Sequence, residues 1–473
     1  MRRAPIALVL AALCAGCALK PPPDPADVRR DAMPNLAVPD KWTAQGAAAG
    51  AVADGWLASF HDAQLDALVR EVIANNADLR VAAARVEQAA AYAKLAGATL
   101  YPQVGIMARG GGKMSGDSSG LEGVGLFASW ELDLWGRVRA QARSSELQYD
   151  SARLDAEYAR QSLASLVVKG WVVAVESRLQ KAQAETSLRS AEQLASLARD
   201  RLRVGSGDEY AVILAQANVE AFRDTVRNLD LVYGNALRAL ETLLGRYPAA
   251  SVAVAEKLPT WPGDIPAGLP SELLERRPDV VAAERRVAAA FYRTEEAKAA
   301  RLPRITLVAS YTSINSELFV LQNRDNPVFS AGAGLLQPIF LGGLLQAQVD
   351  ARTAEQQAAL VEYGKVGARA FGEVEGALAA SATASEREEI LARSVRENER
   401  ALALANVRYR VGTVDLGAVQ QQQLALYSAQ VTLLRVQSER LVQRVNLHLA
   451  LGGSFESAGV PPAKTSDASH AVR

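Results

Sequence analysis

The chain has 473 residues, and its 52 lysines and arginines are balanced by 52 aspartates and glutamates, so the formal net charge is zero. Because basic side chains are not in excess, nucleic acid is not an expected partner. Both cysteines lie within the first 17 residues, which excludes a disulfide framework and a thiolate zinc site elsewhere. The three histidines have no spacing typical of metal ligands or a catalytic triad, and no phosphate-binding glycine loop is present, so we expect no enzyme, metal or cofactor.

The first residues are typical of a bacterial secretory signal, in which two arginines precede an apolar run too short to span a membrane as a helix. We expect a signal peptide over residues 1–16. Small residues precede Cys17, as in a lipobox, so Cys17 is the expected site of lipidation. The alternative is an ordinary cleaved signal. Residues 17–62 are rich in proline, alanine and aspartate and are expected to form an extended, lipid-anchored segment.

Two helices are expected after this segment. Leucine and valine recur on one face over residues 61–75, which predicts a short amphipathic helix. A second helix is predicted over residues 77–100, and it stops before Pro102 because proline cannot continue it.

Alternation of apolar and polar residues predicts four strands, two in each half of the chain. In the second strand, every other residue from Val124 to Leu134 is apolar, over a length that suits a tilted membrane strand. The two faces of the fourth strand are ambiguous, and Pro338 is expected at its end or at a sheet edge. The expected ranges are about 102–113, 121–134, 303–314 and 327–340.

Long helices follow the strands. Residues 137–203 predict a helix of about 100 Å, given the rise of an α-helix per residue. Over residues 208–245 apolar side chains recur at spacings of three and four for five heptads, which predicts coiled-coil packing. Many of these residues are alanine, so the helices are expected to pack closely. The second half repeats the pattern, with an interruption at Arg440.

The two halves of the chain repeat one another. The stretch that begins at Asp78 reads again from Asp279, and RVGSGD at 203–208 returns as RVGTVD at 410–415. We therefore expect a first structural repeat over 63–245 and a second over 271–452. A proline-rich linker over 246–270 joins them, and a partly disordered tail is expected over 453–473.

Four long strings of residues resemble the outer-membrane efflux protein family. The TolC-like fold of this family has a lipoprotein branch that serves resistance-nodulation-division pumps, and the resemblance extends over residues 56–452. The strings are SWELDLWGRVRAQ (129–141), LLERRPDVVAAERRVAAA (273–290), LLQPIFLGG (335–343) and RYRVGTVDLGAVQQQQLALYSAQ (408–430).

The resemblance implies a mainly α fold with membrane β structure. Three chains would form a homotrimer, whose strands close a twelve-stranded barrel in the outer membrane and whose helices form a periplasmic tunnel. The linker would lie in an equatorial belt. The implied partners are a periplasmic adaptor and an inner-membrane resistance-nodulation-division transporter, and the implied function is passive efflux of small molecules, including drugs. A type I protein secretion duct, or a lipid-anchored coiled-coil scaffold without a pore, remains as an alternative.

The turns between long helices are the main candidate sites, and we call residues 203–208 and 410–415 the two tips. Asp208 and Asp415 occupy positions where a carboxylate caps a helix, and capping by itself accounts for them. The resemblance adds a second role, in which these carboxylates ring a closed periplasmic entrance. It also implies that the tips contact the adaptor, through Arg203, Val204, Gly205, Arg410, Val411 and Gly412.

Aromatic residues cluster near the expected strand ends. Trp130, Trp135, Tyr311 and Phe340 are candidates for a girdle at the bilayer interfaces. Ordinary core packing is the alternative, above all for Trp135.

Overall fold

The computed structural model describes residues 21–45, 47–48, 50–109, 121–316 and 327–456. Cys17, the signal peptide expected over 1–16 and the tail beyond residue 456 lie outside the described residues. The described chain divides into two compact units. The first contains Ala82–Ala156 and Asp279–Ala368, with the N-terminal residues up to Leu36. The second contains Ala37–Val81, Glu157–Pro278 and the chain from Arg369 onward.

Corresponding helices of the two halves have equal lengths. The helices α4 (Ala77–Ala98) and α8 (Pro278–Ala299) both have 22 residues. Likewise, α5 (Arg137–Arg203) and α9 (Leu344–Arg410) both have 67, and α6 (Glu209–Leu243) and α10 (Leu416–Ala450) both have 35. The internal repeat predicted from the sequence is therefore confirmed. No described helix combines the length and apolar character needed to cross a membrane.

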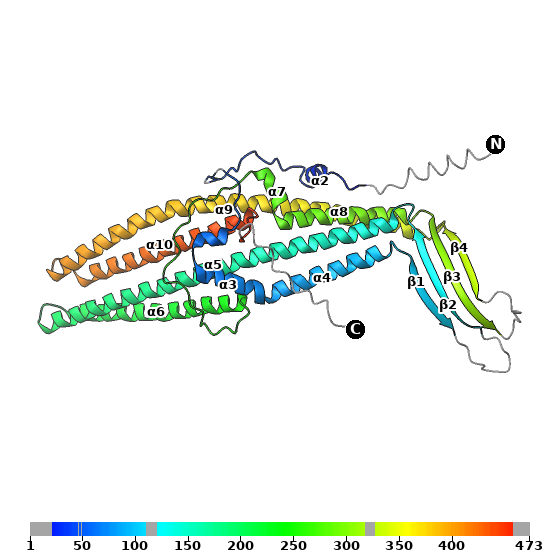
Figure 1. Ribbon diagram of the computed structural model, residues 1–473. Coiled ribbons are helices and arrows are strands. Elements are labelled where there is room, and N and C mark those ends of the chain that lie inside the picture. The colour runs from blue at the N-terminus through cyan, green and yellow to red at the C-terminus, as the bar shows by residue number, and fades with distance from the viewer. Residues whose placement is uncertain (1–20, 46, 49, 110–120, 317–326, 457–473) are drawn as a thin grey trace. The chain divides into compact units, whose positions relative to one another are not determined.

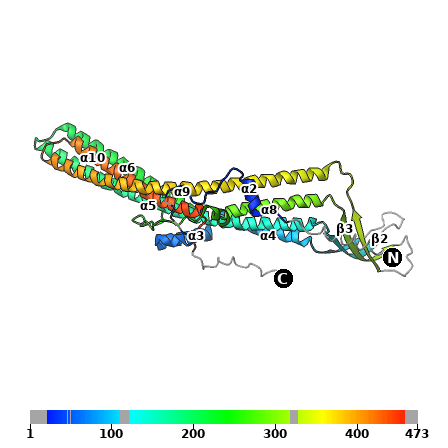
Figure 2. The same cartoon turned by 90° about the horizontal axis from the view of Figure 1, so that it is seen from above.

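In the first unit α4, α5, α8 and α9 lie next to one another as a layer (Figures 1 and 2). Hydroxyl groups on small residues link these helices. Ser144 Oγ and Ser151 Oγ of α5 donate to backbone carbonyls of α8, at 2.9 and 3.1 Å. Thr294 Oγ1 of α8 donates to the Arg352 carbonyl of α9 at 3.1 Å. Small side chains at these contacts let the helix backbones approach closely.

The first unit also contains one antiparallel sheet, in the order β1-β2-β3-β4 (Figure 1). The pairing of β2 with β3 joins the two repeats in a single sheet. The strands are β1 (Gln103–Arg109), β2 (Leu121–Leu132), β3 (Arg304–Ser316) and β4 (Val328–Leu336).

Two strands end earlier than the sequence predicts, for different reasons. β2 stops at Leu132, short of residue 134, because Asp133 turns away to cap α5. The Asp133 carboxylate accepts hydrogen bonds from the backbone N–H groups of Val138 at 3.1 Å and Arg139 at 2.9 Å. β4 stops at Leu336, short of residue 340, because Pro338 has no N–H with which to continue a ladder.

The extended conformation predicted for residues 17–62 is wrong for two stretches. The helix α2 (Pro25–Ala32) begins at Asp24, whose Oδ1 accepts from the Ala26 N–H at 2.9 Å, and proline occupies its first position. The 3₁₀ helix η1 (Trp56–Phe60) is amphipathic and packs into the second unit, where Trp56 is 3% exposed. Burial of Trp56 in the second unit therefore orders η1, although the composition of this segment predicts irregular structure.

The core of the second unit brings together α3 (Ala63–Asn75), α5 and α6. Trp171 of α5, Leu65 of α3 and Leu240 of α6 are all almost completely buried in one cluster. The linker between the repeats packs on this cluster through Val252 and Val254, so it is part of the unit. The linker leads into η2 (Pro270–Glu272) and then α7 (Leu273–Arg276).

Two equivalent joints connect helices in the second unit. The Asn76 side-chain amide, directly before α4, donates to the Leu243 carbonyl at the end of α6 at 3.0 Å. Arg277, directly before α8, donates to the Ala450 carbonyl at the end of α10 at 3.2 Å and to Glu373 at 2.6 Å. The Arg277 side chain is 0% exposed. In each repeat, therefore, the end of the last helix meets the start of the first long helix.

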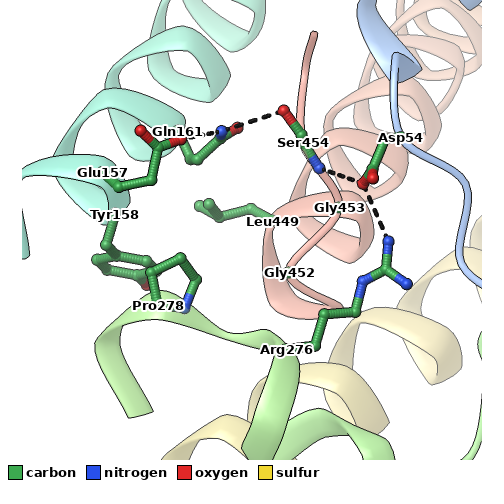
Figure 3. Close-up of a pocket in the computed structure, with 10 residues that line it drawn as sticks. All are labelled: Asp54, Glu157, Tyr158, Gln161, Arg276, Pro278, Leu449, Gly452, Gly453 and Ser454. Carbon is green, nitrogen blue, oxygen red and sulfur yellow. Dashed lines mark hydrogen bonds and ion pairs between the residues drawn. The ribbon is translucent and has the colours of Figure 1, made fainter. Parts of the chain in front are cut away.

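The last described residues pass between the N-terminal segment and α5 (Figure 3). Asp54 Oδ1 accepts from the Ser454 N–H and from the Arg276 guanidinium, each at 2.9 Å. The Phe455 N–H donates to Gln161 Oε1 at 3.1 Å, and the Phe455 ring is 7% exposed. These bonds fix residues 453–456 in the second unit.

Candidate functional site

The register of the sheet gathers apolar side chains on one face. Residues directly opposite each other on antiparallel strands point to the same face, so each pair extends that face by one strand. Leu126 opposes Ile106 and Tyr311, and Tyr311 opposes Phe329. This resolves the ambiguous faces of the fourth strand. Besides these four, the apolar face contains Val104, Ala108, Val124, Ala128, Trp130, Leu132, Ile305, Leu307, Ala309, Ala331, Ala333 and Leu335.

Most of these apolar side chains are exposed in the single chain, and the rest are partly exposed. Ile106 is 74% exposed, and Phe329 and Leu335 are each 71% exposed. Contiguous apolar surface of this kind marks contact with a membrane or with another protein. The sheet is therefore built to meet an apolar environment on this face.

The opposite face of the sheet is the more polar of the two, although Met107, Phe127, Val308, Val328 and Leu336 also lie on it. Gln103, Glu131, Arg304 and Thr306 lie on it, and Ser310 and Ser330 hydrogen bond to each other there at 2.7 Å. Gly125 is needed on this face, because a Cβ atom there would lie 2.4 Å from Thr312 Cγ2. One sheet thus presents an apolar face and a face on which polar and apolar side chains are mixed.

The outer strands β1 and β4 leave two open edges. Each pairs with a single neighbouring strand among the described residues. Their outward N–H and carbonyl groups are therefore available to strands of another chain.

Charged side chains reinforce the junction between the sheet and the helices. Glu131, on the polar face, receives two hydrogen bonds from Arg137 at 2.7 and 2.9 Å, and Arg304 lies 3.9 Å away. Arg137 begins α5, so this pair holds the end of β2 against the start of the helix. The three side chains are about a fifth to a half exposed, with 20% for Glu131 and 46% for Arg304.

The predicted interface aromatics fall into two groups. The Trp130 and Trp135 indole N–H groups donate to the carbonyls of Leu100 and Pro303, at 3.0 and 2.7 Å. Leu100 lies three residues before β1 and Pro303 directly before β3, so both indoles hold strand starts in place. Tyr311 is 51% exposed on the apolar face, whereas Phe340 lies after the end of β4 and is 86% exposed.

The two tips have the same backbone geometry in the second unit. Gly205 in the first tip and the equivalent Gly412 in the second have a positive φ, 75° and 80°, which favours glycine. In the first tip the Ser206 N–H donates to the Arg201 carbonyl at 2.9 Å. In the second, the Thr413 N–H donates to the equivalent Arg408 carbonyl, also at 2.9 Å.

Both tip carboxylates cap helices. Asp208 Oδ1 accepts from the Ala211 N–H at 2.7 Å at the start of α6, and Asp415 Oδ1 accepts from the Ala418 N–H at 2.9 Å at the start of α10. The capping role predicted from the sequence is therefore confirmed. Both side chains remain exposed, as do Arg203 and Arg410. Val204 and Val411 are 72% and 68% exposed.

The tips are joined by a contact that the helical periodicity does not reveal. The Arg201 guanidinium lies over the Tyr409 ring, 4.5 Å from its centroid. Below it, alanines of α5 pack with Val219 and Phe222 of α6 and with Val419 of α10. Leu202, four residues after the buried Ala198, is instead 40% exposed. Apolar packing between α5 and its neighbours therefore stops before the tip, although the helix continues to Arg203.

Two further polar residues are understood only from the fold. Arg440, which interrupts the apolar repeat, lies 3.9 Å over the Trp261 ring and pairs with Glu388 at 2.8 Å. Glu241, four residues after the buried Leu237, is 1% exposed and accepts backbone hydrogen bonds from the linker. In the sequence, only the occurrence of a charged residue within an apolar repeat could have indicated that Arg440 has a specific partner.

The model of the outer membrane efflux protein family matches residues 68–246 and 269–453. The chain is 33% identical to the pyoverdine export outer membrane protein OpmQ of Pseudomonas putida over 420 residues, which is 85% of this chain and 88% of that protein. It is 30% identical to the cation efflux system protein CusC of Escherichia coli K12 over 456 residues, which is 93% of this chain and 96% of that protein.

Solved structures give the same result for the fold. The outer-membrane channel OprN matches with a TM-score of 0.79 and 27% identity, over 90% of this chain and 99% of that one. A structure of CusC matches with a TM-score of 0.79 and 28% identity, over 92% of this chain and 99% of that one. The fold is thus that of the TolC-like channels.

Proposed function

The chain belongs to the outer membrane efflux protein family, and from this premise we propose that it is the outer-membrane channel of a tripartite efflux system. It provides a passive exit duct for small molecules. An inner-membrane transporter of the resistance-nodulation-division class delivers them through a periplasmic adaptor. The names of the relatives, which refer to pyoverdine export and cation efflux, support outward transport of small solutes.

The observation that carries this proposal is the two-faced sheet with open edges. In lipid, each unpaired backbone group costs several kcal/mol, so an open four-stranded sheet is not a stable membrane structure. Membrane barrels need about eight strands or more, so chains must combine their sheets. We propose a homotrimer that closes a twelve-stranded barrel, with the apolar face towards lipid and the polar face towards the lumen.

Two substitutions at neighbouring positions of β4 test the orientation of the sheet. Ala331 lies on the apolar face and Ser330 on the polar face. Ala331→Arg is expected to impair membrane insertion, since an arginine on the lipid face of a barrel costs about 2–4 kcal/mol near the bilayer midplane. Ser330→Arg is expected to insert and to shift ion selectivity towards anions.

The measurements are native mass spectrometry of the detergent-solubilised protein and single-channel recording in planar bilayers. Three chains per particle and a conducting pore are expected for the unmodified protein. A stable monomer or dimer, or equal insertion defects in the two variants, would refute the barrel. A protein that binds membranes without conductance would instead support the lipid-anchored scaffold.

The tips are the proposed periplasmic entrance. Three copies would bring six carboxylates of Asp208 and Asp415 around one aperture, and such a ring attracts cations. Because asparagine also caps helices, changing both residues to asparagine removes the charge while it retains much of the capping. The expected result is weaker cation selectivity and weaker block by multivalent cations, with little loss of thermal stability. Unchanged selectivity and block would leave capping as the only role.

The exposed side chains of the tips are the proposed adaptor contacts. Val204 and Val411 lie between charged and glycine residues in the two tips and are mostly exposed. Changing both valines to aspartate should weaken adaptor binding in a pull-down with purified adaptor and leave conductance unchanged. Adaptor binding as strong as in the unmodified protein would exclude these residues from the contact.

Lipidation at Cys17 and the aromatic girdle remain proposals based on the sequence. Cys17→Ala should abolish incorporation of labelled palmitate, while the sheet would still permit membrane insertion. Persistent labelling would refute the site. For the girdle, the exposed Tyr311 and Phe340 are the candidates, and Trp130 and Trp135 would have a combined structural and interfacial role.

A further inference from the structure

A groove of about 440 Å³ lies on one face of the helical layer in the first unit. Side chains from α4, α5, α8 and α9 line it, so the groove reaches across all four helices. It is separate from the sheet and from the tips, and none of the roles described above uses it.

The lining of the groove carries an excess of positive charge. Three arginines, Arg85, Arg293 and Arg352, face a single carboxylate, Glu296. Glu296 already lies 3.9 Å from Arg137, and Arg352 pairs with Glu355 on its own helix at 2.7 Å. Arg85 and Arg293 have no carboxylate within ion-pair distance among the described residues, although the charge of Arg293 acts on Glu296 from farther away.

Neutral hydrogen-bonding groups and apolar surface complete the groove. The side-chain amides of Gln88 and Gln141 have no hydrogen-bond partner within the part of the chain that the structure describes. Tyr92 and Leu95 of α4 contribute apolar surface and are 60% and 63% exposed. A ligand that suits this lining has a negative charge, further polar atoms and an aromatic or alkyl part.

We propose that this groove binds amphiphilic organic anions, with Arg85 and Arg293 contacting the anionic group and Tyr92 contacting the apolar part. Guanidinium groups bind carboxylate, sulfonate and phosphate through charge-assisted, often bidentate hydrogen bonds. Arg352 supplies additional positive charge beside its pair with Glu355. The proposal rests on the proposed function in one respect, namely that the bound anion belongs to the class of molecules that the channel exports.

Calorimetric titration of the full-length protein in lipid nanodiscs tests the site. The probes are 2-naphthoate and the neutral 2-naphthamide, which have the same ring and differ in charge. Saturable binding of 2-naphthoate, at least tenfold tighter than binding of 2-naphthamide, is expected. The double variant Arg85→Gln/Arg293→Gln should lose at least a factor of ten in affinity for 2-naphthoate and none for 2-naphthamide. Tyr92→Ala should weaken binding of both.

The matched control is Arg80→Gln/Arg285→Gln. These arginines lie on the same two helices, α4 and α8, and outside the groove, so the control removes the same charge elsewhere. Its affinity for 2-naphthoate should equal that of the unmodified protein. Arg85→Lys/Arg293→Lys should retain part of the binding because it retains the charge. Partial binding by this variant would show that the loss in the glutamine variant comes from the missing charge and not from misfolding.

Two results would overturn the proposal: equal loss of affinity in the groove variant and the control, or 2-naphthamide binding as tightly as 2-naphthoate. Single-channel recording on the same preparation separates this proposal from the proposed function. A conducting channel without the predicted binding refutes the groove alone. Binding without conductance refutes the channel and leaves the groove in place.

Discussion

Glu241 offers a sharp test of how the linker is held on the second unit. Its carboxylate is almost fully buried and accepts four hydrogen bonds where the chain turns after α6. The donors are the Ala250 and Ser251 N–H groups, each at 2.6 Å, and the Ser251 hydroxyl and the Val252 N–H, each at 3.0 Å. Ala250 adopts a positive φ of 58°, which helps to aim these groups at one carboxylate.

Glu241→Gln keeps the size of the side chain and removes its charge. An amide has one acceptor oxygen and turns its NH₂ group towards the remaining donors, so one or two buried donors lose their acceptor. Each such loss costs about 1–3 kcal/mol. We therefore expect the free energy of unfolding to fall by about 3 kcal/mol near neutral pH. The matched control is Glu220→Gln on the exposed face of the same helix, expected to cost less than about 1 kcal/mol.

The effect should also depend on pH. Burial by itself would raise the pKa of Glu241, but the hydrogen bonds from Ser251, Ala250 and Val252 outweigh it and lower the pKa. A carboxyl group with a lowered pKa in the folded state stabilises that state above its unfolded pKa, and this contribution is lost as the pH falls through the folded pKa. The difference between the unmodified protein and Glu241→Gln should therefore shrink below about pH 4.5.

Thermal and urea unfolding, followed by circular dichroism from pH 3 to pH 7, measure these differences. Two outcomes would refute the reasoning. One is equal stability of the two proteins at pH 7, and the other is a stability difference that grows as the pH falls.

Three further predictions concern joints and caps. Arg277→Met leaves the carbonyl at the end of α10 unpaired and should lower the free energy of unfolding by about 3 kcal/mol, measured by urea titration. Gly364→Ala places a Cβ atom 2.2 Å from the Ala32 carbonyl oxygen, so it should displace α2 and speed tryptic cleavage there, whereas Gly372→Ala meets nothing within 4 Å and should not. Asp208→Ala removes the cap of α6 and should cost about 0.5–2 kcal/mol in thermal unfolding.

Each of these predictions has its own contradicting result. Unchanged stability of Arg277→Met would show that water replaces the guanidinium at the joint. Equal cleavage rates in the two glycine variants would show that α2 is not held against α9. A destabilisation by Asp208→Ala as large as that of a core deletion would show that the tip carboxylate does more than cap one helix.

The sequence by itself determined the local elements and their repetition. The bounds of α5 agree with the prediction because apolar spacing, a preceding glycine and a closing tip all act within a few residues. The geometry of the tips could also be predicted from the sequence. Gly205 permits a positive φ and Asp208 caps a helix, and equivalent residues recur in the second repeat. The helix α2 was missed although Asp24 and Pro25 form a recognisable start, because the composition of the surrounding segment argued for irregular structure.

Only the tertiary structure decided which distant groups meet. The faces of β4 depend on its register with β3, which a glycine-rich strand with Phe329 and Leu335 does not specify alone. Arg201 over Tyr409, Arg277 at the end of α10 and the arginines of the groove are each brought together from separate helices. Periodicity reports which face of an element is buried, whereas the partner on that face is set by long-range packing.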